Sequence, residues 1–315
     1  MCINPKMSNY KFAIQAKQLN KTYNRKNSKP VDALIDFNID IPRGSIYGLL
    51  GPNGAGKSTF INILGGLVKK NSGEISICGI NTDEDPKKTR MKIGIVPQEL
   101  NMDPFFTPYE LLELQAGLYG VRKKDRITDE ILTRVKLIEQ KNAYARTLSG
   151  GMRRRLLVAK SLVHKPDVVI LDEPTAGVDI ELRKNLWDYV KELNKNGTTI
   201  CLTTHYLEEA ENLCDYITII NNGRILKSDT KKNLLNLIGR KTVSFILDSL
   251  DINIPNELNK FNPTLNDNQL LLNYDKKKIK LKEIINILNT NKISFNEINT
   301  YESDLEDVFI DLVKK

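Results

Sequence analysis

The stretch Gly51-Pro52-Asn53-Gly54-Ala55-Gly56-Lys57-Ser58 decides the fold of this 315-residue chain. It satisfies the pattern G-x-x-x-x-G-K-[ST] and lies between a predicted strand at residues 45–50 and a predicted helix at residues 57–67. Glycines let backbone N–H groups turn inward around phosphates, and the helix N-terminus adds its positive dipole end. The sequence therefore predicts a phosphate-binding loop, or P-loop, in place of a chance turn before a helix. Lys57 would reach the β- and γ-phosphates of a nucleotide, and the Ser58 hydroxyl would ligate magnesium.

Two adjacent carboxylates, Asp172 and Glu173, follow a hydrophobic strand predicted at residues 168–171. Ligands of open α/β sheets bind at the carboxyl ends of the strands. Asp172 is suited to hold magnesium through its water shell, and Glu173 to polarise an attacking water. Adjacent acids after a strand are also common on surfaces, so it is the P-loop upstream that favours the catalytic interpretation.

Two more side chains follow predicted strands and are expected at the same sheet edge. His205 comes after a strand at residues 198–203, and we interpret it as a γ-phosphate contact. Gln98 comes after a strand at residues 93–96, where its carbonyl would reach the magnesium or the water. The only other histidine, His164, ends a predicted helix before a Lys-Pro pair, and we interpret it as a helix cap.

A second anion site is predicted at Leu148-Ser149-Gly150-Gly151-Met152, which precedes a helix expected at residues 152–164. A serine and glycines at a helix start expose N–H groups toward a phosphate. An ordinary helix start has the same spacing, and the spacing alone leaves both interpretations open.

The order of predicted elements indicates an α/β fold with a smaller appendage. Strands are expected at residues 12–19 and 34–41, and strands then alternate with helices, which implies a largely parallel, doubly wound sheet. The periodicity between residues 108 and 145 is helical and marks an inserted helical segment. Beyond residue 240, the pattern is that of a small α+β unit with an asparagine-rich stretch at residues 256–268.

The composition excludes several classes of protein. With 40% hydrophobic residues the chain can bury a large core, and no apolar run approaches the roughly 18 residues of a membrane helix. The polar N-terminal residues are unlike a secretion signal, and four scattered cysteines fit a reducing compartment. The net charge of +8 suits a nucleic-acid or membrane partner, but the lysines form no single basic patch, which favours a general compositional bias.

Taken together, these motifs resemble those of the ATP-binding-cassette (ABC) family, over about residues 12–225. The signature sequence of that family is similar to residues 148–152, although methionine stands where glutamine is commoner. The resemblance implies a cassette at residues 10–235 with a mostly parallel core sheet, an antiparallel β subdomain and a helical signature subdomain at about residues 100–165. Residues 240–315 would form the accessory α+β domain. The nucleotide-site residues that it implies are the P-loop with Thr59, the adenine-stacking Tyr23, the Q-loop Gln98, the Walker B Asp172, the catalytic Glu173, the D-loop Ala176-Gly177-Val178-Asp179 and the switch histidine His205.

The resemblance also implies how such a chain works. Two cassettes, here a homodimer, would pack head to tail, with ATP and magnesium between the P-loop of one and the signature of the other. The segments Val96-Pro97-Gln98-Glu99 and Leu305-Glu306-Asp307-Val308-Phe309 look like those of ABC-2-type export subunits. Such a subunit would sit on the cytoplasmic face of the cell membrane, bound to an integral-membrane permease that selects the cargo.

Three alternatives differ in partner or activity. A soluble cassette ATPase acting on nucleic acid or ribosomes would suit the basic charge, but two cassettes in one chain and a long coiled-coil insertion are missing, so no nucleic-acid partner is expected. A non-hydrolysing nucleotide-binding module would be expected to lack Glu173 or His205. An importer would share the cassette chemistry, and only the ABC-2-like segments favour export.

Overall fold

The computed structural model describes residues 10–24, 29–175, 180–238, 240–248, 254–275, 278–302 and 304–313. The chain divides into two compact units, Met1–Asp229 and Thr230–Lys315, which are described separately. The expected cassette end at residue 235 falls inside a helix, α8 (Lys231–Ile238), that belongs to the second unit. Leu234 of this helix is fully buried, and α8 packs against the last helix of the same unit, α10 (Leu305–Val313).

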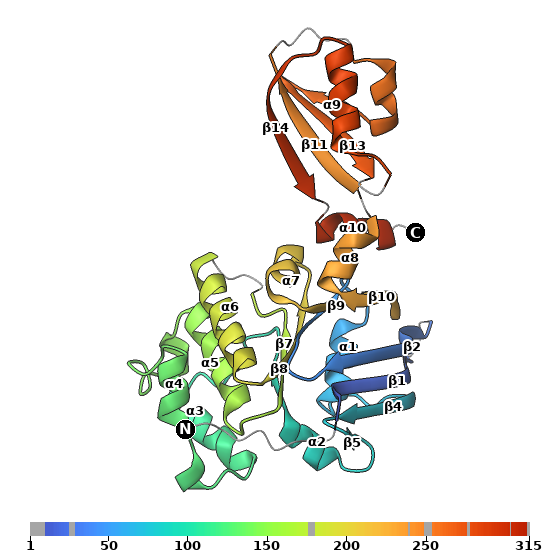
Figure 1. Ribbon diagram of the computed structural model, residues 1–315. Helices are drawn as coiled ribbons and strands as arrows, with labels where there is room; N and C mark the ends of the chain where they lie inside the picture. Colours follow the sequence, from blue (N-terminus) through green and yellow to red (C-terminus); the bar gives the residue numbers. More distant parts are fainter. Residues whose placement is uncertain are drawn as a thin grey trace. The chain divides into compact units, whose positions relative to one another are not determined.

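A six-stranded sheet in the order β10-β9-β3-β8-β7-β6 is the centre of the first unit (Figure 1). Its β6-β7, β7-β8, β8-β3 and β3-β9 pairs are parallel, as the sequence predicts. Because Leu50 pairs with Thr204 and Asp172 with Thr203, the strands end along one edge. The strands are β3 (Ile46–Leu50), β6 (Ile93–Val96), β7 (Val168–Asp172), β8 (Thr199–Thr204), β9 (Tyr216–Asn221) and β10 (Arg224–Thr230).

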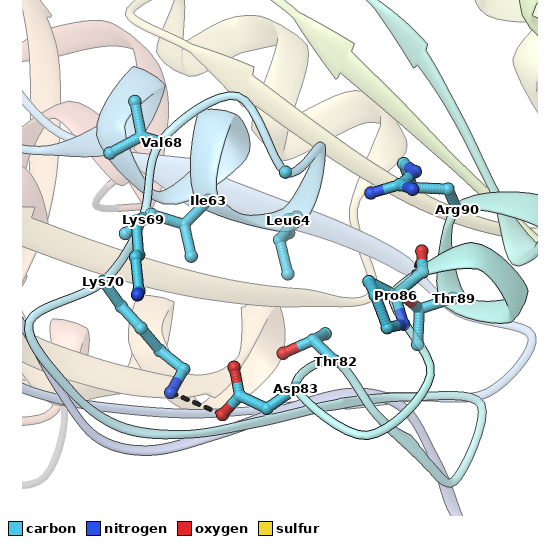
Figure 2. A pocket seen from close by; sticks show the side chains of 11 residues that line it. Ile63, Leu64, Val68, Lys69, Lys70, Thr82, Asp83, Pro86, Thr89 and Arg90 are labelled. Carbon is cyan, nitrogen blue, oxygen red and sulfur yellow. Dashed lines mark hydrogen bonds and ion pairs between the residues drawn. The ribbon is translucent and has the colours of Figure 1, made fainter.

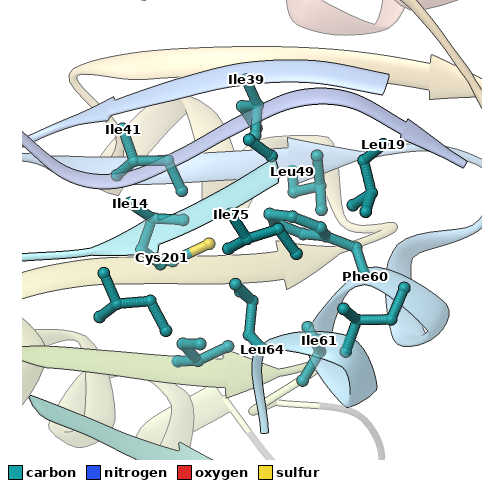
Figure 3. Packing of buried hydrophobic residues seen from close by; sticks show 14 of the residues in the cluster. Ile14, Leu19, Ile39, Ile41, Leu49, Phe60, Ile61, Leu64, Ile75 and Cys201 are labelled. Carbon is teal, nitrogen blue, oxygen red and sulfur yellow. The ribbon is translucent and has the colours of Figure 1, made fainter. Parts of the chain in front are cut away.

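A second, antiparallel sheet confirms the expected β subdomain. Its order is β2-β1-β4-β5, with β1 (Phe12–Tyr23), β2 (Val31–Pro42), β4 (Ser72–Ile77) and β5 (Ile80–Asn81). Phe60 of the P-loop helix, α1 (Lys57–Leu64), packs against Phe37 of β2 with ring centroids 5.0 Å apart. Figure 3 shows the same core reaching the parallel sheet through Leu49 and Cys201. The core therefore fixes α1 against both sheets.

The inserted segment is helical, as expected, and its first helix, α3 (Pro108–Leu118), begins with a local cap. Thr107 and Glu110 form a capping box at the start of α3, each satisfying a backbone N–H near that helix end. The helices of the unit after α1 are α2 (Pro86–Lys92), α3 (Pro108–Leu118), α4 (Thr128–Arg134), α5 (Gly150–Leu162), α6 (Ile180–Lys195) and α7 (Leu207–Leu213), with short 3₁₀ turns at Lys123–Asp125 and Ala145–Thr147.

His164 does not act as the expected helix cap. Its Nε2 lies 2.9 Å from the Ile93 carbonyl oxygen at the start of β6, and its ring stacks on Tyr119 at a centroid distance of 3.7 Å. The imidazole points inward because the Tyr119 ring and the Ile93 carbonyl oxygen offer it a stacking contact and a hydrogen bond. His164 thus joins the end of α3 to the central sheet.

The second unit has its own antiparallel sheet, in the order β12-β13-β11-β14, and its own core around Phe245 and Phe261. The asparagine-rich stretch contributes a 3₁₀ turn, Asn256–Phe261, and the short β12 (Thr264–Asn266). The other elements are β11 (Arg240–Leu247), β13 (Gln269–Asp275), α9 (Leu281–Thr290) and β14 (Phe295–Glu302). The expected α+β character is therefore confirmed.

Candidate functional site

The P-loop backbone requires glycine at its last turn. Gly56, which precedes α1, has φ +111°, and a Cβ on it would lie 2.5 Å from the Ala33 carbonyl oxygen. Gly54 also has a positive φ, +81°, where a side chain would be strained. These conformations curve the loop around the start of α1. Lys57, the first residue of that helix, therefore has its side chain within the loop.

Lys57 is held by the loop's own carbonyl groups. Its Nζ donates to the backbone oxygens of Gly51 at 2.6 Å and Pro52 at 3.2 Å, and the residue is only 5% exposed. Burial lowers the pKa of the Lys57 ammonium, while the carboxylates of Glu173 and Asp172 act against that shift. The charge on the Lys57 amine therefore depends both on burial in the P-loop and on the nearby carboxylates of Asp172 and Glu173.

Thr203 at the end of β8 organises both carboxylates. Its hydroxyl donates to Asp172 Oδ1 at 2.6 Å, and its hydroxyl and carbonyl oxygens both lie 3.1 Å from the Glu173 backbone nitrogen. Burial raises the pKa of the Asp172 carboxyl, although bonds from Thr203 and Ser58 and the charge of Lys57 lower it. Thr203 could not be singled out from the sequence, because no local pattern distinguishes it from any other β-branched strand residue.

The side chain of Glu173 joins two of the predicted partners. Its Oε2 accepts a hydrogen bond from Gln98 Nε2 at 3.1 Å and lies 3.2 Å from His205 Nδ1. Glu173 is 7% exposed and has φ +45°, which is uncommon for a residue with a side chain. The carboxyl ends of β6, β7 and β8 thus bring Gln98, Glu173 and His205 together.

The residues beside the P-loop fit a magnesium ion. The hydroxyl of Ser58 acts to lower the pKa of the Asp172 carboxyl, which indicates that one hydroxyl and one carboxylate lie close together beside the loop. Magnesium is usually bound by one or two protein oxygens together with waters and phosphate oxygens. Ser58, Asp172 and Gln98 are the groups that would hold the ion.

The predicted second anion site stands at the start of α5. Ser149 is the N-cap and accepts from the Met152 backbone N–H at 3.3 Å, while Leu148 is buried and anchors the turn. A Cβ on Gly150 would meet nothing within 4 Å, so this helix start is open. Among the described residues, no hydrogen bond joins this turn to the P-loop.

The other predicted residues lie as follows. Tyr23 ends β1, with Lys21 Nζ 4.9 Å from its ring centroid, and Thr59 is half-buried in α1. The expected D-loop with Asp179 lies outside the described residues. Arg154 of α5, which the sequence analysis did not select, is buried and donates to the Pro97 carbonyl oxygen at 2.8 Å, next to Gln98.

A cavity of about 200 Å³ lies near the far end of α1, between that end and α2 (Figure 2). An ion pair between Lys70 and Asp83, 2.7 Å long, borders it, and Arg90 projects toward it from α2. It contains none of the predicted site residues. Its lining is formed by Ile63, Leu64, Gly66, Val68, Lys69, Lys70, Thr82, Asp83, Pro86, Thr89 and Arg90.

Comparison with known proteins agrees with the geometry. Residues 34–176 match the family model described as ABC transporter. The linearmycin resistance ATP-binding protein of Bacillus subtilis is 38% identical over 73% of this chain and 73% of its own length. The chain belongs to the ABC transporter family. It is an ABC ATPase.

Other ABC relatives carry related names. A Nod factor export ATP-binding protein I of Cupriavidus pinatubonensis is 41% identical over 69% of this chain and 67% of its own length. A daunorubicin resistance ATP-binding protein of Streptomyces coeruleorubidus is 37% identical over 75% of this chain and 72% of its own. In the described part of this chain, no helix is both long and apolar enough to cross a membrane.

Solved ABC cassettes share the fold. One, a dimer in a post-hydrolysis state bound to ADP and Pi, has a TM-score of 0.62 and 30% identity, and the match covers 69% of this chain and 98% of that one. Another, an ATP-binding subunit of an ABC transporter, has a TM-score of 0.64 and 28% identity over 72% of this chain and 93% of that one.

Proposed function

We propose that this chain is the ATP-hydrolysing subunit of an exporter and works with a separate integral-membrane permease of the ABC-2 type. The observation that carries the hydrolytic part is the contact of Glu173 with both Gln98 and His205 beside the buried Lys57. The names of the relatives, which refer to Nod factor export and to resistance to linearmycin and daunorubicin, support export.

The residues divide the chemistry among them. The P-loop N–H groups and Lys57 bind the β- and γ-phosphates, and His205 contacts the γ-phosphate. Glu173 orients the attacking water and polarises it, as the bond from the γ-phosphorus to the bridging oxygen breaks and ADP leaves. Ser58, Asp172 and Gln98 would hold magnesium, which would neutralise the charge on the phosphate oxygens.

The second anion site completes the nucleotide site from another copy. Ser149 and Gly150 lie at an open helix N-terminus, which is suited to a γ-phosphate. The dimer reported for the related cassette with ADP and Pi supports an arrangement of two copies. ATP between two copies stabilises the closed pair by its differential affinity for that state, and hydrolysis lets the pair reopen. The permease places the chain on the cytoplasmic face of the membrane.

The test uses the Glu173→Gln substitution in the full chain. Loss of a positioned base should slow ATP hydrolysis by roughly 10² to 10⁴-fold while ATP binding remains. The matched control is Glu208→Gln, at an exposed glutamate of α7. Full hydrolytic activity of Glu173→Gln would contradict the assignment.

The same variant identifies the partner. Tagged Glu173→Gln protein, purified from its native membranes with ATP and magnesium, is expected to retain a multi-spanning permease, whose identity opens the question of cargo. Recovery of ribosomes or nucleic acid without a membrane protein would overturn the transport proposal and leave the ATPase site intact.

A further inference from the structure

Glu209 is a buried carboxylate that the mechanism does not use. It lies on α7, is 1% exposed, and its Oε1 accepts two hydrogen bonds. One comes from the Thr175 hydroxyl at 2.6 Å and the other from the Trp187 indole N–H at 3.0 Å. Its Oε2 has no partner among the described residues. Burying a carboxylate costs free energy, and the two hydrogen bonds compensate for only one of its oxygens. The burial of Glu209 therefore requires an explanation.

The Thr175 bond fixes the backbone just after the catalytic carboxylate. Thr175 is fully buried and stands two residues after Glu173. At the other end of this short segment, the Glu173 backbone N–H is held by Thr203. The segment that carries Glu173 in its left-handed conformation is therefore held at both ends, at β8 and at α7.

The helix that carries Glu209 also adjoins the turn that carries His205. Helix α7 begins two residues after His205, and the Glu209 backbone N–H donates to the Tyr206 carbonyl oxygen at 3.1 Å. The Tyr206 ring lies 4.2 Å from the His205 ring and 4.9 Å from the Arg183 guanidinium of α6. Helix α6 thus contacts the His205 turn through Arg183 and Tyr206, and contacts α7 through Trp187 and Glu209.

We infer that Glu209 is a positioning residue for ATP hydrolysis, which holds Glu173 and His205 at their working separation by tying Thr175, Trp187 and α7 together. The inference rests on the proposed function of Glu173. No bond is made or broken at Glu209 itself. A displacement of about 1 Å in a reacting group can cost on the order of 10²-fold in rate, so a support of this kind has a measurable effect on hydrolysis.

The experiment compares three variants of the full chain in steady-state ATP hydrolysis. Glu209→Ala removes both acceptor bonds and should lower kcat about 10- to 100-fold, with KM for ATP changed less than about 3-fold because the P-loop is unaltered. Glu209→Gln should stay within about 3-fold of wild-type kcat, since its amide oxygen can accept both bonds and its nitrogen replaces an oxygen that makes none. Glu208→Ala, at the exposed neighbour, should have no effect.

Two readouts keep the test decisive if Glu209→Ala folds poorly. Thr175→Val keeps the shape but removes the hydroxyl, so it should lower kcat in the same way, and the double variant should be no slower than Glu209→Ala alone. Trp187 is the only tryptophan of the chain, so its fluorescence should shift in Glu209→Ala and remain unchanged in Glu208→Ala.

Wild-type kcat in Glu209→Ala or in Thr175→Val would overturn the inference, and so would a loss in Glu209→Gln equal to that in Glu209→Ala. The Glu173→Gln variant separates the two proposals. If it is inactive while Glu209→Ala hydrolyses ATP normally, only the role of Glu209 fails; if it is fully active, the hydrolytic site itself is wrongly assigned.

Discussion

Asp172 lies where burial opposes its charge. Its pKa is raised, chiefly by burial, although Thr203, Ser58 and Lys57 favour the ionised form. A folded-state pKa above the unfolded value means that ionised Asp172 costs folding free energy above that pKa, and that the cost disappears as the pH falls. A divalent cation beside a carboxylate acts in the opposite direction. A carboxylate that destabilises the fold on its own is therefore well suited to bind magnesium.

His164 gives the residue-scale prediction. Burial lowers its pKa below the ordinary value of 6.5, and its Nδ1 has no partner within the described ranges. Because the unfolded state takes up the proton first, the free energy of unfolding should fall as the pH drops below about 6.5 and level off below the folded pKa. Well above 6.5, both states are neutral and His164 contributes no pH dependence.

Thermal unfolding of wild type and His164→Phe at pH 7.5, 6.5 and 5.5 measures this effect. Phenylalanine keeps a ring against Tyr119 and cannot be protonated, so the gap between wild type and variant should shift against wild type at the acidic end. A gap that stays constant over the three pH values would contradict the prediction. Other groups titrate equally in both proteins and cancel from the comparison.

At the scale of elements, an aromatic contact helps to hold the P-loop helix against the antiparallel sheet. Phe60 is fully buried on α1 (Figure 3) and packs on Phe37 of β2. Phe60→Ala should therefore reduce the free energy of unfolding by about 3–5 kcal/mol. Leu67→Ala, three residues past the end of α1 and 80% exposed, should change it by less than about 0.5 kcal/mol. Urea unfolding measures both changes in the free energy of unfolding. Equal changes would contradict the prediction that packing of Phe60 stabilises the fold more than the exposed Leu67 does.

The elements that the sequence predicted are those with strong local signals. The P-loop glycines, the apolar strand before Asp172 and the alternation in β1 are each visible within a few residues. Helices α2 and α7 have seven residues each, too few for a helical period to emerge, and both were missed. The sequence offered no boundary signal near residue 230, because strand β10 runs directly into α8 without a glycine or proline between them.

The same distinction applies to the candidate site. Asp172, Glu173, Gln98 and His205 follow strands, so a strand-order argument placed them at one edge. Thr203, Arg154 and Glu209 act through contacts between segments that are far apart in sequence; Thr175 and Glu209, for example, are 34 positions apart. Such partners depend on strand register and helix rotation, which no local pattern specifies.

At the scale of the whole molecule, the question is whether one copy forms a complete nucleotide site or two copies share it. The P-loop and the helix start at Ser149 allow these two arrangements to be separated by experiment. A site shared between two copies needs an intact P-loop from one copy and an intact helix start from the other. The open space around Gly150 allows this to be tested, because a side chain there meets nothing in its own copy. A glutamate at that helix N-terminus favours the helix but repels a phosphate brought by a second copy.

Gly150→Glu and Lys57→Ala should therefore each fold and each hydrolyse ATP slowly when alone. Mixed in equal amounts, they should regain activity, because a pair of unlike copies contains one site with the P-loop of the first variant and the Gly150 of the second. Random pairing makes about half of the dimers mixed, each with one intact site of two, so recovery of about a quarter of wild-type turnover is expected if one site suffices. If each copy formed its site alone, every site in the mixture would carry a defect, and the activity would stay at the level of the separate variants.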